Sequence, residues 1–169
     1  MAKALDRSEK RLSATLRCDA DYVADHMEEL HAENASIFKY NDENSLSCVI
    51  SIAYYYARND YHMLRELPTG KAAHARQNSS KLGSAEREQA RTKSKGYADI
   101  VFLPRKNVSK PALVIELKKD RTARAAIDQI KERRYPQQVE QYSGEMLLVG
   151  ISYDTDSKKH DCRIERWKK

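Results

Sequence analysis

The chain has 169 residues, a length that favours one domain with its own hydrophobic core, because two domains would each be small for independent folding. With 40% hydrophobic and 33% charged residues, the composition excludes a disordered chain and indicates a folded protein with a heavily charged surface. The apolar runs fall far short of the roughly 20 residues of a membrane span, and the N-terminus lacks the apolar segment of a secretory signal, so we expect a cytoplasmic protein.

The net charge of +6 agrees with a polyanionic partner such as nucleic acid, since Lys and Arg side chains attract phosphates. Cys18, Cys48 and Cys162 are odd in number and far apart, which indicates reduced thiols rather than a disulfide framework or a CxxC site. The five histidines show no HxxxH or HExxH spacing, and His26 and His31 lie five apart, on different sides of a helix. We therefore expect no zinc site.

Three helices are predicted in the first third of the chain. Apolar residues recur at close to helical spacing over residues 7–17 and again over 20–33, which indicates two short amphipathic helices. From Leu46, apolar residues follow the i, i+3, i+4, i+7 pattern of a third helix, with Asn41 or Asp42 as its cap.

A strand and a basic loop follow these helices. Residues 61–67 predict a strand that ends at Pro68. Over 72–95 the composition changes to Ala, Ser, Gln, Lys and Arg, with Leu82 as the only sizeable aliphatic residue. Such a segment buries too little apolar surface to offset its ordering entropy, so it predicts a loop. Its basic side chains suit contact with a phosphate backbone, but a simple solvated loop also explains them.

The second half of the chain predicts a sheet with one helix. Further strands are predicted over residues 98–103, 112–117, 146–153 and 162–167. The first three are nearly continuous apolar runs, typical of strands covered on both faces, whereas the last alternates like an edge strand. Asp120 or Thr122 begins a helix that Pro136 ends. The inner positions of that helix are Ala123, Ala126, Ile127 and Ile130. Together these elements predict an α/β domain with helices packed on a mixed sheet.

Two acidic residues interrupt the apolar strands: Asp99 near the start of one and Glu116 at the end of the next. Burying an ionised carboxylate is costly unless a cation or hydrogen-bond donors compensate it. A divalent metal ion is the economical compensation, and carboxylate oxygens suit Mg²⁺ or Mn²⁺. The alternative is a structural ion pair at a strand end, formed by Glu116 with Lys118 or Lys119.

Lys118 lies two residues after Glu116. On a strand this spacing directs both side chains to the same side of the sheet, with Leu117 pointing into the opposite layer. The carboxylate and the ammonium are therefore expected to share one pocket. In a phosphodiester hydrolysis a metal ion would lower the pKa of a bound water, and Lys118 would orient that water or stabilise charge.

These residues lie in recognisable segments. Gly96-Tyr-Ala-Asp99-Ile-Val and Ile115-Glu116-Leu-Lys118 resemble the bipartite motif of the PD-(D/E)XK nuclease superfamily. A wider similarity, to the C-terminal nuclease domain of bacterial proteins with an AAA-ATPase-like N-terminal region, includes residues 40–48, 65–70, 104–108, 110–118 and 127–130. The chain departs from the pattern at Ala98, where the motif has Pro, and at 72–95, which resembles an insertion, natural or engineered.

The resemblance implies a restriction-endonuclease-like fold in one domain over 1–169, with N-terminal helices over 1–33 and an inserted flexible loop over 72–95. It also implies hydrolysis of nucleic acid, most of all DNA, with Mg²⁺ or Mn²⁺ as cofactor and an ATPase-like region in the parent protein. The residues implied in the site are Asp99, Glu116, Glu43 and the Leu117 carbonyl as metal ligands, Lys118 beside the attacking water, and Gln129 facing the site.

Other interpretations stay open for several of these residues. An acid such as Glu43 is favourable in the first turn of a helix in any case, and Gln129 suits a structural hydrogen bond equally well. Tyr54, Tyr55 and Tyr56 suggest base stacking, but three consecutive helical residues point three ways, so at least one belongs to the core. The whole chain is alternatively a catalytically silent module of nuclease fold that binds nucleic acid or protein, or a scaffold with an engineered loop. Trp167 is expected to pack on the last strand.

Overall fold

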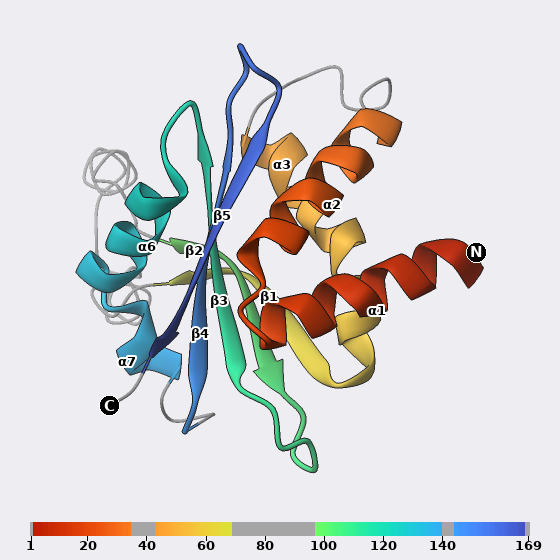
Figure 1. The fold of residues 1–169 in the computed structure, drawn as a ribbon. Coiled ribbons are helices and arrows are strands. Elements are labelled where there is room, and N and C mark those ends of the chain that lie inside the picture. The colour runs from red at the N-terminus through yellow and green to blue at the C-terminus, as the bar shows by residue number, and fades with distance from the viewer. Residues whose placement is uncertain (1, 35–42, 69–96, 140–143, 168–169) are drawn as a thin grey trace, which may run out of the picture.

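The computed structural model describes residues 2–34, 43–68, 97–139 and 144–167, and within them a five-stranded sheet carries helices on both faces (Figure 1). The strand order is β1-β2-β3-β4-β5. Strands β3 and β4 run parallel, and the other neighbouring pairs are antiparallel. The elements are α1 (Ala2–Leu16), α2 (Ala20–Asn34), α3 (Glu43–Ala53), η1 (Tyr55–Asn59), β1 (Tyr61–Pro68), β2 (Tyr97–Pro104), β3 (Ala112–Lys119), α6 (Ala123–Glu132), α7 (Tyr135–Val139), β4 (Met146–Tyr153) and β5 (His160–Trp167).

Helices α1, α2 and α3 cover one face of the sheet, and α6 and α7 cover the other (Figure 1). Side chains alternate between these two layers along the strands, because successive strand residues point to opposite faces. In β2, Ile100 and Phe102 belong to the cluster under α1, α2 and α3, whereas Val101 and Leu103 belong to the cluster under α6 and α7. Every residue of β4 is buried, which explains its continuous apolar run. The predicted α/β class with a mixed sheet is confirmed.

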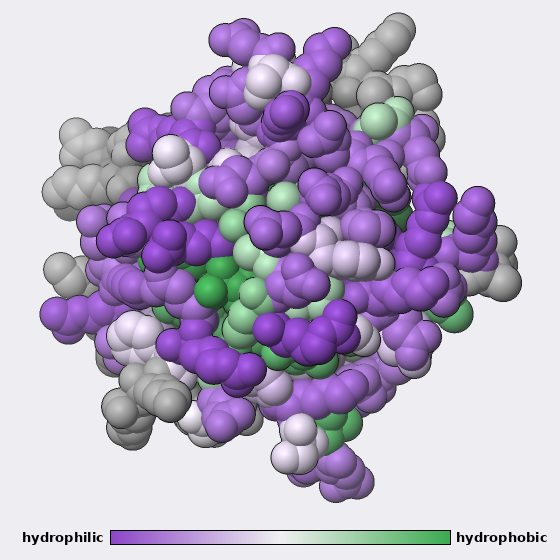
Figure 2. Space-filling model, in the orientation of Figure 1, coloured by the Kyte–Doolittle hydropathy of each residue, from purple (hydrophilic) through white to green (hydrophobic). Residues whose placement is uncertain are grey.

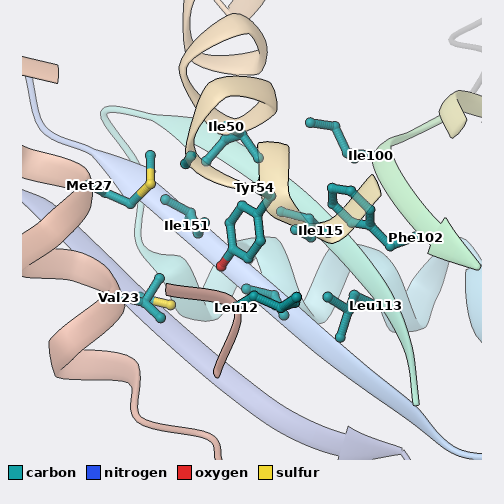
Figure 3. Close-up of a cluster of buried hydrophobic side chains, with 14 of the residues drawn as sticks. Leu12, Val23, Met27, Ile50, Tyr54, Ile100, Phe102, Leu113, Ile115 and Ile151 are labelled. Atoms are coloured by element: carbon teal, nitrogen blue, oxygen red, sulfur yellow. The ribbon is translucent and has the colours of Figure 1, made fainter. Parts of the chain in front are cut away.

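The larger core cluster lies between the sheet and the N-terminal helices. Figure 3 shows Tyr54 among aliphatic side chains from helices and strands. Its buried hydroxyl lies 2.7 Å from Thr15 Oγ1, so the polar atom keeps a hydrogen-bond partner. Arg11 is also buried here, and its Nε donates to the Ala53 carbonyl over 3.2 Å. Tyr54 is therefore the core residue expected among the three tyrosines, while Tyr55 is 55% exposed.

The predicted helices and strands that fall in the described ranges are present. Two boundaries are wrong. Helix α1 begins at Ala2, well before the predicted start at residue 7. Helix α6 ends at Glu132, and Pro136 is the second residue of α7. Proline is tolerated in the first turn of a helix, where its missing N–H would lack an intrahelical partner in any case. The proposed caps Asn41 and Asp42 and the loop over 72–95 lie outside the described residues.

The surface is mainly hydrophilic on the face drawn in Figure 2, with a smaller apolar area near its centre. Strand β5 closes one edge of the sheet, as the alternation in its sequence predicts. Trp167 packs against the cluster under α6 and α7, which confirms its expected structural role. None of the helices in the described ranges combines the length and the apolar character that crossing a membrane requires.

Candidate active site

Glu116 lies near the end of β3, and only 2% of it is exposed. Its neighbours along the strand are apolar, so the strand carries this carboxylate into the interior rather than into water. Burial of an ionised carboxylate costs several kcal/mol unless charges or hydrogen bonds compensate it. The surroundings of this one side chain therefore define the site.

Two nitrogen donors meet at Glu116 Oε1. Lys118 Nζ lies 3.1 Å from this oxygen and forms an ion pair with it, in which the lysine side chain is 13% exposed. Gln129 Nε2, from α6, donates a hydrogen bond to the same oxygen. The structure thus brings together three of the predicted site residues. Leu117 packs into the opposite layer, which confirms the predicted alternation along β3.

Helix α6 reaches the carboxylate because it packs very closely on β4. Gly150 of β4 is the register partner of Glu116, and a Cβ at this glycine would collide with the Ala123 carbonyl oxygen and lie 3.0 Å from the Ala126 Cβ. The absence of a side chain therefore sets the distance between helix and sheet. Sequence reasoning missed this residue, although an isolated glycine inside an apolar strand is a known signal of close backbone approach.

The start of α6 is fixed by Thr122, whose Oγ1 accepts a hydrogen bond from the Ala125 N–H over 3.1 Å. This is one of the two starts that the sequence predicts, and it satisfies one of the amide groups that lack a partner in the first turn. All four predicted inner positions of the helix are buried against the sheet. The cap and this apolar face together orient the helix so that Gln129 points to the end of β3.

Strands β2 and β3 pair over a short stretch beside Glu116. The last recorded partners are Ile100 and Ile115, whereas β3 and β4 stay paired as far as Lys119. Continuing the first register by one step would place the backbone of Asp99 opposite Glu116. The side chains of Asp99 and Glu43 lie outside the described residues, so their place in the site stays a prediction.

A family model described as PD-(D/E)XK nuclease superfamily matches residues 86–162, somewhat less than half of the chain. The match supports this superfamily. It spans β2, β3, α6, α7 and β4, and so contains Asp99, Glu116, Lys118 and Gln129. The mixed sheet with flanking helices is a restriction-endonuclease-like arrangement. No curated protein and no solved structure matches the chain. The resemblance to ATPase-linked nuclease domains stays a prediction.

The donors at this site are hard oxygen atoms. In the described part of the chain the structure places the Glu116 carboxylate here, and no three His, Cys, Asp or Glu side chains gather there as a ready metal cluster. Oxygen donors of this type suit Mg²⁺ and Mn²⁺, which often bind through one or two carboxylates together with water and phosphate oxygens. The donor chemistry thus fits the ion that the superfamily implies.

Proposed function

We propose that the chain hydrolyses phosphodiester bonds of nucleic acid, and of DNA in particular, in a reaction that depends on a divalent metal ion. The observation that supports this most is the buried Glu116 carboxylate, which Lys118 and Gln129 contact within the segment that matches the nuclease superfamily. A buried acid with a cation and an amide beside it is a costly arrangement for stability alone. It is understandable as a site prepared for an ion and a phosphate.

Asp99, Glu116, Glu43 and the Leu117 carbonyl would hold the ion. When bound, Mg²⁺ or Mn²⁺ would supply a Lewis acid that neutralises charge on the phosphodiester. The Glu116 carboxylate is already desolvated, so its attraction for a cation is weakened less by water than that of a surface acid. Asp99 enters this proposal because continuing the β2–β3 register by one residue would place its backbone opposite Glu116, and Glu43 enters it because α3 begins there.

Lys118 would act on the reacting groups. Its ammonium lies at the edge of the buried site, where it reaches both the carboxylate and the solvent side. From there it can donate a hydrogen bond to the attacking water and stabilise the negative charge that develops on the phosphate oxygens. Gln129 is instead a positioning residue, because its amide fixes the orientation of the Glu116 carboxylate through a single oxygen.

A plasmid-nicking assay with Mg²⁺ or Mn²⁺ tests the proposal. We expect Asp99→Ala and Glu116→Gln each to lower the nicking rate by a factor of about 100 or more, a typical loss when an electrostatic group of an active site is removed. Glu132→Gln is the matched control, because Glu132 is an exposed acid on the outer side of α6. Removal of the metal by a chelator should stop the reaction. Equal nicking by the wild type and Asp99→Ala would contradict the proposal.

A second candidate function is a silent nuclease-fold module that binds nucleic acid or protein within a larger ATPase-like protein. It is favoured by the ion pair itself, since Glu116 Oε1 accepts hydrogen bonds from both Lys118 and Gln129. Titration calorimetry separates the two functions. Metal binding that disappears in Glu116→Ala supports the enzyme, whereas nucleic-acid binding that is indifferent to metal, together with an inactive wild type, supports the module.

A further inference from the structure

Two histidines far apart in the sequence meet on the other face of the sheet. His31 lies in the last turn of α2, and His160 is the first residue of β5. The Nδ1 atom of His31 lies 3.4 Å from the Nε2 atom of His160. Both rings also contact Tyr153, the register partner of His160 on β4. Helix α2 is thus joined to the end of the sheet through a pair of imidazole nitrogens.

The two nitrogens lie at the long end of the range for a hydrogen bond. A nitrogen-to-nitrogen distance of 3.4 Å is longer than the roughly 2.7 to 3.2 Å that is usual for N–H donors. Two nitrogen ligands that each lie about 2.0 to 2.1 Å from a tetrahedral ion are separated by roughly 3.3 to 3.4 Å. The ring centroids are 5.2 Å apart, which is too short for nitrogens that point straight at each other. The contact is bent, a geometry that suits a long hydrogen bond between the rings and also two ligands of one ion.

The surroundings keep both rings in the form that binds metal. His31 is 7% exposed, and burial lowers the pKa of its imidazole. Burial, and then the neighbouring His31, lower the pKa of His160 to about 4. Both rings are therefore neutral near pH 7, which a metal-ligating histidine requires. The His160 Nδ1 atom is buried and has no hydrogen-bond partner among the described residues, so Nε2 is its engaged nitrogen.

A small cavity adjoins His160. It is lined by apolar side chains from α2, α3 and the sheet, together with Lys118, Ser152, Tyr153 and His160. Its volume of about 10 Å³ is room for one water-sized group. An ion between the two nitrogens needs further ligands, and a water molecule in the space beside His160 would be one of them.

We propose that His31 and His160 form a chelating site for a borderline divalent cation such as Zn²⁺, which fastens α2 to β5. Imidazole nitrogen suits Zn²⁺, Cu²⁺ and Ni²⁺, whereas Mg²⁺ prefers oxygen, so this site is chemically distinct from the acidic one at Glu116. No third His, Cys, Asp or Glu joins the pair within the described ranges. With two protein ligands the site binds more weakly than a structural zinc site with four. The inference does not depend on nuclease activity.

Zinc titration of the full chain, freed of metal by a chelator, tests the site. We expect saturable binding of one Zn²⁺ in the presence of excess Mg²⁺, and a rise in Tm on binding because only the folded chain presents the pair. His31→Gln and His160→Gln should each weaken zinc binding by roughly tenfold or more. Removing a residue that only hydrogen-bonds to a metal ligand already lowers metal affinity about tenfold, and removing the ligand itself should lower it further. His62→Gln, at an exposed histidine of β1, is the matched control and should bind as the wild type does.

A second measurement needs no variant and so does not depend on whether the variants fold. In NMR spectra of the wild type, the imidazole signals of His31 and His160 should shift when Zn²⁺ is added, whereas those of His62 should not. Imidazole signals of the pair that stay unchanged at saturating Zn²⁺ would overturn the site. So would zinc binding that survives His160→Gln and disappears in Glu116→Gln, because the ion would then belong to the acidic site.

Discussion

Polar groups are buried at one end of the sheet on both faces, and the two faces stabilise them in different ways. Under α6, Glu116 is a carboxylate that receives hydrogen bonds from a cation and an amide. Under α2, His31 and His160 contact mainly each other and Tyr153. The carboxylate is compensated by donors, whereas the imidazoles avoid the cost of burial by staying neutral.

This difference shows which substitutions and conditions each face tolerates. Removing a donor on the α6 side leaves a buried charge with less compensation, so the effect should be large at any pH where the acid is ionised. On the α2 side the two histidine rings are neutral near pH 7, so the effect of their burial should appear only where protons bind. Substitutions and changes of pH should therefore affect the two faces differently.

Lys118→Ala should have the largest effect. It removes the cation from the buried Glu116 carboxylate, and breaking such a pair from one side costs on the order of 3 kcal/mol. Urea unfolding should show this loss in the free energy of unfolding, and nicking activity should fall together with it. Lys119→Ala is the matched control, since Lys119 is the next residue of β3 and the sequence offered it as the alternative partner. Equal losses of unfolding free energy in the two variants would mean that the loss does not come from the ion pair between Glu116 and Lys118.

Acid should destabilise the α2 side of the metal-free chain by a smaller amount. The pKa of His160 in the folded chain is about 4, below the unfolded value near 6.5, so the unfolded state binds protons first as the pH falls. The contribution of the neutral His160 ring to the free energy of unfolding is fully present above about pH 6.5. It is lost between that pH and about 4, by on the order of 2 to 3 kcal/mol. Asp120 and Asp154, whose pKa values are lowered by hydrogen bonds, lose their contributions only at lower pH.

Unfolding measured between pH 7 and pH 4 checks this window. His160→Gln should flatten the dependence of the unfolding free energy on pH, because the residue can no longer titrate. His62→Gln should retain the slope of the wild type. A wild-type curve that is flat over this range would contradict neutral burial of the pair.

The sequence predicted the fold well where local pattern and burial coincide. The apolar run of β4 and the inner face of α6 each had a single physical explanation, and both lie where expected. The spacing of Glu116 and Lys118 was equally informative, since alternation along a strand leaves one choice of side. The role of Asp99 stays a prediction because its side chain lies outside the described residues.

The sequence could not predict contacts that arise from tertiary packing alone. His31 and His160 are 129 residues apart, and no local spacing relates them. The end of α6 was placed too late because Pro136 is compatible both with the end of one helix and with the first turn of the next. The distance between α6 and the sheet is short because Gly150 has no side chain, and the pattern of apolar residues does not reveal such a contact.

Gly150→Ala should have the smallest of these effects on stability and still reach the site. The added methyl would collide with the Ala123 carbonyl and crowd Ala126, so α6 must shift outward, at a cost of about 2 kcal/mol for overpacking. The same shift carries Gln129 away from Glu116, and we expect slower nicking even at temperatures where the variant is fully folded. Gly144→Ala is the matched control, because a methyl there meets nothing within 4 Å. Unchanged nicking by a destabilised Gly150→Ala chain would show that the close approach of α6 serves packing alone, and that Gln129 does not position the carboxylate.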